Sequence, residues 1–437
     1  MTDGDTLAAR AREELGFSRW WLIIAAAGAM GVVSPYQYVW SSIEGPIARD
    51  LGVPLPALGL VFTLFVVFQA GSQFPVGRWR DEHGPRELTA LAAILAGGSY
   101  VGLSVATSVT QLYLLYSLGA VGVGIVYTVA VNTALKWFPD RRGLTTGVGT
   151  MAFAGGAAAF VPFVRANATV DAYQFVLQVM GAIIFLVLLV AAVVLRDPPE
   201  GYRTEQSEES GENDGPDGTS DGERSGSRRQ YSATETLTTW QFYVMYAMFV
   251  GVSGAGLMVT AKVVSFAQAA GMTSLTATVS ATVLPIAAGG GRLVMGDLSD
   301  RLEPRYVMAG SFTLCGVGVA SVAAAALADS SVGFVLAVVA AVFFWSPQYT
   351  LFPTLIGRYY GEMHSSSNYA LLYSGKVWGG VFGGAVAGWI VASAGWTVAF
   401  GAGATLALAA GGAALLLRPV DGTSPTGHAD GTVSGDD

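Results

Sequence analysis

Two basic residues, Arg292 and Lys376, lie inside long apolar segments and are the side chains best placed to do chemistry. A charged side chain at the centre of a bilayer costs about 2.5–3.5 kcal/mol on insertion scales, so it usually has a function. Lys376 lies about ten residues into its predicted helix, roughly 15 Å from the start at 1.5 Å per residue and therefore near the midplane. Arg292 precedes Asp297 by five residues, and we expect it about a third of the way along its helix. A third cation, Lys262, is near a helix end, where we expect its long side chain to reach the interface.

The predicted membrane helices carry no Asp or Glu in their middle thirds that could neutralise Arg292 and Lys376. Glu44 and Asp50 belong to the outer end of the first helix and the loop beyond it, and Asp297 to the inner edge of the eighth. We therefore expect a ligand to supply the negative charge. In the alternative interpretation, Arg292 reaches Asp297 and Lys376 binds backbone carbonyls.

Aromatic residues could complete an anion site around the two cations. Aromatic walls exclude water and hold a small flat anion, and phenol hydroxyls can donate to its oxygens. The alternative is that these rings only pack or lie at the membrane interface. The candidates are Tyr36 or Tyr38, Tyr127, Phe153, Trp345, Tyr349 and Tyr373.

The chain composition indicates which elements must position these residues. Of 437 residues, 52% are hydrophobic and 12% are charged, whereas a soluble domain carries about 25% charged residues. Several runs longer than the ~18 residues that cross a bilayer contain no charge at all. The pattern predicts an all-α polytopic membrane protein and excludes soluble enzymes and nucleic-acid binders. We expect twelve transmembrane helices at 19–43, 55–79, 86–107, 111–137, 143–165, 172–195, 239–263, 275–297, 305–328, 332–358, 366–393 and 396–417.

The predicted helices form two six-helix bundles, 19–195 and 239–417, joined by an acidic linker, 196–238. The linker has almost no apolar residues and cannot bury a core, so we expect it to be disordered. Residues 1–18 and 418–437 are polar ends. Eighteen of the 23 basic residues fall on one side if both ends are cytoplasmic, and cytoplasmic loops are typically rich in Lys and Arg. We therefore expect a multi-pass protein of the cell membrane with both termini cytoplasmic.

The two bundles repeat one motif. Gly77-x3-Asp81-x3-Pro85-Arg86 recurs 219 positions later as Gly296-x3-Asp300-x3-Pro304-Arg305. A duplicated unit places a binding site at the midplane, where the halves meet. Both copies of the motif lie in predicted cytoplasmic loops. A carboxylate that caps a helix there, or pairs with Arg across the cytoplasmic face, would close the inner side of the protein, so Asp81, Arg86, Asp300 and Arg305 are candidate gating residues. The alternative is that these residues only anchor helix ends at the headgroups.

The repeat also compares the two halves at the candidate site. Gln73 corresponds to Arg292, and Phe153 corresponds to a position at or next to Lys376. The first half therefore carries neutral residues where the second carries cations. We expect the second half to clamp the anion and the first to pack against it.

Two further stretches narrow the comparison, Pro35-Tyr36-Gln37-Tyr38-x-Trp40 and Lys136-Trp137-Phe138-Pro139-Asp140-Arg141-Arg142-Gly143. With the duplicated loops and the linker, the chain resembles the major facilitator superfamily and, within it, the oxalate:formate antiporter family. The resemblance implies a binding site made of a helix 8 arginine, a helix 11 lysine and surrounding aromatic rings. Arg292, Lys376, Tyr127, Trp345 and Tyr349 match that pattern, and Tyr36 fits it. Phe153 and Tyr373 depart from it, because close relatives carry Tyr and Trp there.

These features predict a secondary transporter that exchanges small carboxylates, such as oxalate and formate, by alternating access. Two unpaired cations match the charge of a dianion. We expect no enzyme activity, no cofactor and no metal; the partners are small carboxylate anions and the lipid bilayer, and the protein is expected to be a monomer.

Two alternatives stay open. The first is a proton-coupled symporter of lactate or pyruvate; its animal relatives tend to carry Asp four residues before the helix 8 arginine, where this chain has Ala288. Its histidines, His83, His364 and His428, lie outside the predicted helices. The second is an anion sensor that does not transport.

Overall fold

The computed structural model describes residues 9, 11–138, 142–198, 230–361 and 365–420, and these residues form helices and connecting segments without a strand. The side chains of 74, 81, 82, 134, 135, 142–147, 300 and 365–367 lie outside this description. Large apolar side chains such as Leu275 and Val105 are exposed (72% and 71%). Exposed apolar surface on this scale suits a protein whose surroundings are lipid. The all-α prediction is confirmed.

The first half of the molecule, residues 9–198, is built around the predicted first six helices. Its elements are α2 (Trp20–Val33), α3 (Pro35–Tyr38), α4 (Trp40–Asp50), η1 (Leu55–Leu58), α5 (Gly59–Gly71), α6 (Gln73–His83), α7 (Arg86–Ala92), η2 (Ala93–Gly97), α8 (Gly98–Leu103), α9 (Val109–Trp137), α10 (Arg142–Asn167) and α11 (Tyr173–Val194).

The second half, residues 230–420, follows the same plan. Its elements are α13 (Ala233–Thr236), α14 (Trp240–Ala269), α15 (Ser274–Arg301), α16 (Pro304–Leu327), α17 (Ser331–Trp345), α18 (Gln348–Tyr360), α19 (Ser365–Tyr373), α20 (Gly375–Val381), η4 (Phe382–Val386), α21 (Ala387–Ala394) and α22 (Trp396–Ala414).

Ten helical spans among the described residues are long and apolar enough to cross a membrane, or eleven if the bent pair Trp20–Tyr38 and Trp40–Asp50 is one span. The remaining predicted span, 86–107, is helical over residues 86–103 as α7, η2 and α8. The twelve predicted segments are therefore all helical.

Four predicted helices are interrupted rather than continuous among the described residues. The first bends by 49° after Tyr38, the second breaks at Ser72, the tenth breaks at residues 346–347, and the eleventh breaks at Ser374. Pro35 and Pro347 lie at two of these regions, and proline both lacks an N–H and disfavours helical geometry in the residue before it. Interrupted helices at membrane depth are tolerated where the backbone is buried in protein or lines a site.

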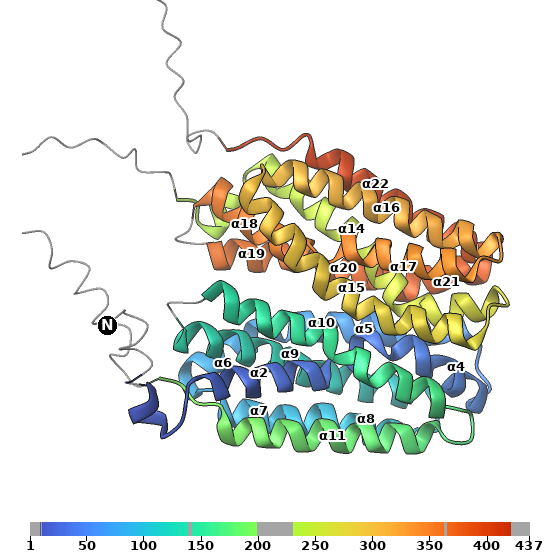
Figure 1. Ribbon diagram of the computed structural model, residues 1–437, viewed down its shortest axis with the longest axis horizontal. Coiled ribbons are helices and arrows are strands. Elements are labelled where there is room, and N and C mark those ends of the chain that lie inside the picture. The colour runs from blue at the N-terminus through green and yellow to red at the C-terminus, as the bar shows by residue number, and fades with distance from the viewer. Residues whose placement is uncertain (1–8, 10, 139–141, 199–229, 362–364, 421–437) are drawn as a thin grey trace, which may run out of the picture.

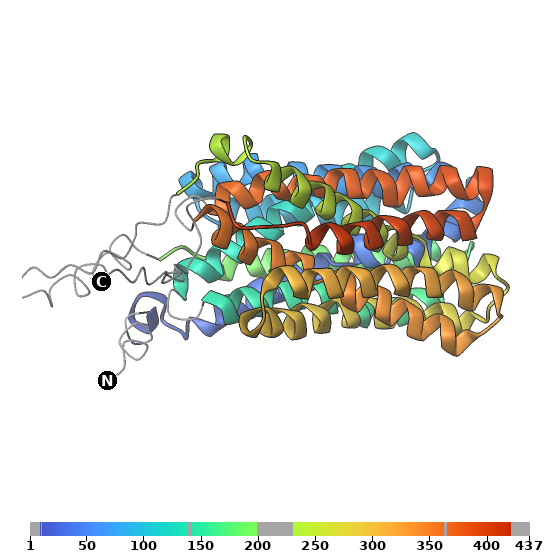
Figure 2. The same cartoon turned by 90° about the horizontal axis from the view of Figure 1, so that it is seen from above.

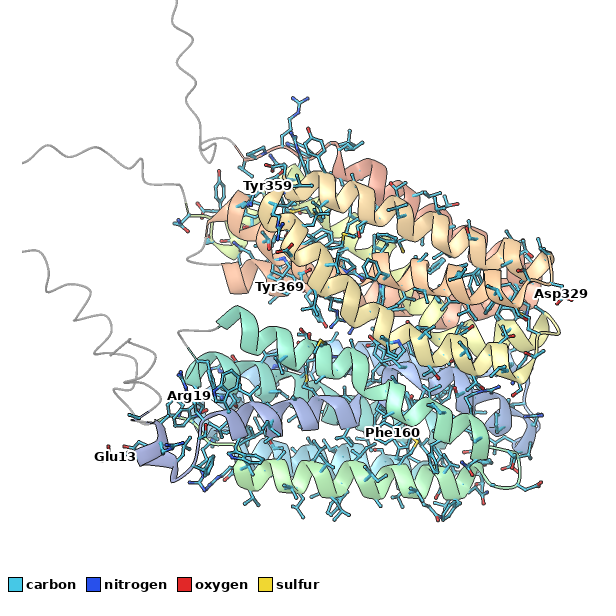
Figure 3. All side chains as sticks on the ribbon, viewed as in Figure 1. Glu13, Arg19, Phe160, Asp329, Tyr359 and Tyr369 are labelled. Carbon is cyan, nitrogen blue, oxygen red and sulfur yellow. The ribbon has the colours of Figure 1, made fainter. Side chains whose placement is uncertain are left out.

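The two halves lie side by side as two bundles of roughly parallel helices (Figures 1 and 2). We call the end that carries Arg80, Arg86 and Arg301 the basic end, and the opposite end, with Asp50 and Asp329, the far end. In Figure 3, Arg19 and Tyr359 mark the basic end and Asp329 marks the far end.

The halves meet most closely where α5 passes η4 toward the far end. A Cβ atom added to Gly59 would lie 2.7 Å from the carbonyl oxygen of Gly384. The Thr63 hydroxyl donates to the Gly380 carbonyl (3.1 Å) and accepts from the Ala385 amide (2.9 Å). Small residues let the two backbones approach, so the glycine pair is needed for this contact.

Candidate anion-binding site

Lys376 begins the site from the second half, in α20 just after the break at Ser374. Its side chain is buried (3% exposed). Its Nζ donates to Gln69 Oε1 in α5 of the first half (2.9 Å) and to the Tyr373 hydroxyl (3.3 Å). The side chain thus reaches across to the other half, and its described partners are these two side chains rather than backbone carbonyls.

Arg292 reaches the first half as well. It lies in α15, is 7% exposed, and its Nη1 donates to the Thr150 carbonyl of α10 (3.1 Å). The alternative partner, Asp297, instead binds Arg301 one turn later (2.9 Å). Arg292 therefore lies between the two halves and hydrogen-bonds across them.

Both cations share one aromatic ring. The Arg292 guanidinium carbon lies 4.9 Å from the Tyr349 ring centroid and Lys376 Nζ lies 5.8 Å from it. Lys376 Nζ is also 5.5 Å from the ring centroid of Tyr373. Ring faces attract cations, but they carry no net charge. Within the described residues neither cation forms an ion pair with a carboxylate, so the positive charge of the site is not neutralised there.

Aromatic side chains from both halves surround these cations. In the second half, the Tyr349 centroid is 5.8 Å from Trp345 and 6.2 Å from Tyr373. Tyr369 is 5.7 Å from Tyr373 and lies on the side of the second half that faces the first (Figure 3).

The first half contributes a matching group of rings. Phe153 is 5.7 Å from Tyr127 and 6.2 Å from Tyr38 between centroids. Tyr38 and Tyr127 both lie within electrostatic range of Arg292. The structure therefore brings Tyr127, Phe153, Trp345, Tyr349 and Tyr373 together around the two cations.

Tyr36 does not lie in this group. Its hydroxyl donates to the Ala96 carbonyl (2.7 Å), and its ring packs 4.6 Å from Tyr100 and 5.1 Å from Tyr116, inside the first half. Residues two apart on a helix do not share a face, so one short helix, α3, sends Tyr36 into its own bundle and Tyr38 toward the cations.

Several buried donors at the site have no hydrogen-bond partner among the described residues. They are Gln69 Nε2, Gln73 Nε2, Arg292 Nε, Trp345 Nε1 and the hydroxyls of Tyr38 and Tyr349. Unsatisfied buried polar atoms are uncommon in native proteins, and each of these can donate. A site with this many free donors and two cations is suited to an anion.

Gln69 is the residue that sequence reasoning missed. Gln73 was noted as the neutral counterpart of Arg292, and Gln69 lies four residues earlier, which places the two amides on similar faces. The sequence does hold one indication of this role, because Gln69 is a polar amide one helical turn before Gln73, the counterpart of Arg292.

Lys262 does not extend to the membrane–water interface, so that expectation is wrong. It is 2% exposed and forms an ion pair with Glu44 across 3.0 Å. The reason is that the first membrane helix continues as α4 to Asp50, so Glu44 lies inside a helix facing α14 and not in a loop.

The candidate gating residues have different surroundings. The side chains of Asp81 and Asp300 lie outside the described part of the chain. Arg86 is exposed, and Arg305 donates to the Leu417 carbonyl (3.1 Å) within the second half. A gating role for these four residues stays a prediction.

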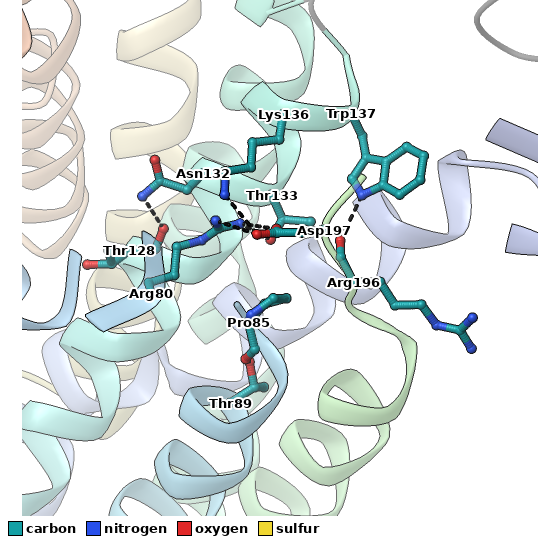
Figure 4. Close-up of polar contacts among 10 residues, drawn as sticks. All are labelled: Arg80, Pro85, Thr89, Thr128, Asn132, Thr133, Lys136, Trp137, Arg196 and Asp197. Atoms are coloured by element: carbon teal, nitrogen blue, oxygen red, sulfur yellow. Dashed lines mark hydrogen bonds and ion pairs between the residues drawn. The ribbon is translucent and has the colours of Figure 1, made fainter. Parts of the chain in front are cut away.

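A charged cluster close to Asp81 does tie helix ends together at the basic end (Figure 4). Arg80 is fully buried and donates to Asp197 (2.7 Å), as does Lys136 (2.7 Å). Arg80 also donates to the Thr133 hydroxyl (3.3 Å). Asp197 thereby joins α6, α9 and the segment after α11 within the first half.

Comparison with known proteins shows the family of the chain. The family model of the Major Facilitator Superfamily matches residues 20–363 and 244–433. The oxalate:formate antiporter of Oxalobacter formigenes is 31% identical over 386 residues, 88% of this chain and 87% of the relative. The uncharacterized MFS-type transporter YhjX of Escherichia coli (strain K12) is 25% identical over 343 residues, 77% of this chain and 80% of the relative.

The solved structure of a D-xylose-proton symporter is similar in fold, with a TM-score of 0.72 at 11% identity over 93% of this chain and 99% of that one. The sequence matches indicate a transporter rather than an enzyme, and the chain belongs to the major facilitator superfamily and, within it, to the oxalate:formate antiporter family.

Proposed function

We propose that the protein exchanges small carboxylates of the oxalate and formate type by alternating access, with the anion held by Arg292 and Lys376 in the aromatic cage. The observation that carries this proposal is that both buried cations contact only neutral oxygen atoms and rings among the described residues. A dianion would neutralise both charges, whereas a monoanion would leave one. The 31% identity to an oxalate:formate antiporter supports the same substrate class.

The contacts of the site suggest how an anion is bound. Lys376 gives up its hydrogen bond to Gln69 and binds one carboxylate group of the dianion. Arg292 gives up its hydrogen bond to the Thr150 carbonyl and binds the other carboxylate group. The present hydrogen bonds already have an ionised donor but a neutral acceptor. A carboxylate adds the attraction between opposite charges, which is strong away from bulk water, so the exchange favours the anion. The free amide groups of Gln69 and Gln73 then donate to its remaining lone pairs, and the rings exclude water.

The charge of the site also accounts for exchange. When the empty site closes on both sides, two cations remain in a region of low dielectric, which is unfavourable. A bound dianion removes that penalty, so the loaded carrier should change sides faster than the empty one. Antiport follows from this difference in rate.

Location and assembly belong to the same proposal. The protein acts as a monomer in the cell membrane, with its basic end on the cytoplasmic side. The basic loops support this orientation, because cytoplasmic loops carry an excess of Lys and Arg.

Uptake of labelled oxalate into proteoliposomes tests the exchange. We expect rapid uptake when the vesicles contain oxalate or formate, and at least tenfold slower uptake when they contain no counter-substrate. Equal rates would contradict exchange. Uptake of lactate or pyruvate driven by a pH gradient would instead support the proton-coupled symporter.

Binding to purified protein tests the two cations separately. Oxalate should raise the melting temperature of the wild type, and Arg292→Gln or Lys376→Gln should weaken its binding by about 10- to 100-fold, since a hydrogen bond to a charged group contributes about 1.5–3 kcal/mol. Arg358→Gln is the matched control, because Arg358 is a partly exposed cation 3.9 Å from Glu303, nine residues beyond Tyr349 in α18. Unchanged oxalate affinity in Arg292→Gln and Lys376→Gln would contradict their proposed role.

A further inference from the structure

A buried ion pair near the far end joins the two halves. Lys262 of α14 donates to Glu44 Oε2 of α4 (3.0 Å), and Ser265 donates to Glu44 Oε1. Glu44 is fully buried and Lys262 is 2% exposed. We call these three residues the clasp.

The clasp differs from the other ion pairs between described residues. Those of Asp197 lie within the first half, and those of Asp297 and Glu303 lie within the second. The clasp connects residues 218 positions apart, one from each half. Its carboxylate also accepts from Ser265, so both oxygens are satisfied.

Other contacts near the clasp are neutral or involve one charge. Thr63 bonds the backbone of Gly380, and Arg165 of α10 donates to the Thr278 hydroxyl of α15 (3.2 Å). Gly45, next to Glu44, packs against the Gln268 amide, which a Cβ would approach to 3.8 Å. Helices α4, α5 and α10 of the first half are thus each bonded or packed to the second half, and the far end is closed in this structure.

We propose that the Glu44–Lys262 ion pair forms and breaks in each transport cycle. The clasp forms whenever the far end closes and separates whenever the far end opens. Alternating access requires the far end to open, and α4 must then move away from α14. The proposal depends on the transporter family and not on which carboxylate is carried.

The physical reason is that this pair is stable in two situations and unstable between them. When the far end is closed, each ion is neutralised by the other; when it is open, water solvates both. A partly open state would leave two buried, separated charges, which is strongly unfavourable. The clasp therefore makes opening all-or-none, which limits leakage of ions while the site changes sides.

Chemical labelling of a buried reporter tests the clasp without any substrate. The reporter is Thr63→Cys in a Cys315→Ser background, because Thr63 is 5% exposed within the closed interface and Cys315 is the chain's single cysteine. The rate of reaction with a hydrophilic maleimide in detergent measures how often the far end opens. All variants carry the same reporter, so any effect of the reporter cancels.

Glu44→Gln or Lys262→Gln leaves one buried charge unpaired in the closed state only, so labelling should accelerate at least tenfold. The charge swap Glu44→Lys with Lys262→Glu should return the rate toward that of the parent, while Arg301→Gln, which breaks an exposed pair within one half, should not change it. An unchanged rate in the monodisperse single variants, or a swap as fast as the singles, would overturn the proposal.

Ser265→Ala covers the case in which the charge variants do not fold. It removes one hydrogen bond and no charge, and we expect labelling about threefold faster. A rate equal to that of the parent would overturn the proposal, because the hydroxyl would then contribute nothing to closure.

Discussion

The chemistry of the site depends on the contrast between Lys376 and its partner Gln69, an uncharged amide. The amide oxygen accepts from Lys376 Nζ at 2.9 Å and leaves the cation with its full charge. A carboxylate at the same position would neutralise that charge from within the protein. We therefore expect the identity of residue 69 to determine whether the site binds an anion.

Gln69→Glu tests this dependence with an almost isosteric change. The new carboxylate would form an ion pair with Lys376 and compete with the substrate, so we expect oxalate binding to weaken at least tenfold while the folded protein melts at the same or a higher temperature. Calorimetric titration with oxalate measures the affinity. Glu at position 69 with wild-type oxalate affinity would show that the anion does not use the charge of Lys376.

Arg292, Tyr127 and Phe153 lie within the continuous helices α15, α9 and α10, whereas the other rings and Lys376 lie beside interruptions. Tyr38 precedes the 49° bend of the first membrane helix, Trp345 and Tyr349 flank the break between α17 and α18, and Tyr373 and Lys376 flank the break at Ser374. Close packing of the remaining helix segments must then hold these pieces together.

Gly59→Ala tests that packing. The added methyl group would lie 2.7 Å from the carbonyl oxygen of Gly384, a backbone atom that cannot rotate away. Overpacking typically costs about 1–3 kcal/mol, so we expect a lower melting temperature and slower exchange. Gly28→Ala in α2 is the control, since nothing lies within 4 Å of its Cβ position. Equal losses at both positions would argue that helix contact at Gly59 has no special importance.

At the scale of the whole molecule, two sets of charges act on the same motion. We propose that Arg292 and Lys376 oppose closure around an empty site, while Glu44 and Lys262, which form an ion pair, favour closure of the far end. The two sets lie at different depths and their effects can be separated. Together these proposed effects would let one protein hold a closed far end and still require a ligand before it changes sides.

The double variant Arg292→Gln, Lys376→Gln distinguishes the effect of the site cations from the effect of the Glu44–Lys262 pair. Without buried cations at the site, the empty carrier should change sides freely, so the Thr63→Cys reporter should label faster in this variant than in the parent when no substrate is present. Oxalate should accelerate labelling of the parent and leave the double variant unchanged. If the empty parent and the empty double variant label equally fast, the charge of the site does not limit the return of the empty carrier.

The sequence was sufficient for the helical segments, because a bilayer requires about twenty apolar residues for each crossing and the charge-free runs meet that length. The positions of Arg292 and Lys376 within apolar runs are likewise visible without coordinates, whereas their role in binding an anion stays a proposal. The duplicated Gly-x3-Asp-x3-Pro-Arg loops likewise pointed to a repeated fold before any contact was known.

Tertiary structure alone decided which partners these residues meet. Lys262 pairs with a carboxylate 218 residues away, and Lys376 binds an amide 307 residues away; no local pattern encodes such distances, because they depend on how two bundles pack. Tyr36 and Tyr38 lie two residues apart in α3 and point in different directions, but only the packing of the two halves decides which of them meets the cations. The helical segments can be predicted because each must be apolar enough to cross a bilayer. The contacts between residues cannot, because they depend on how those segments pack against one another.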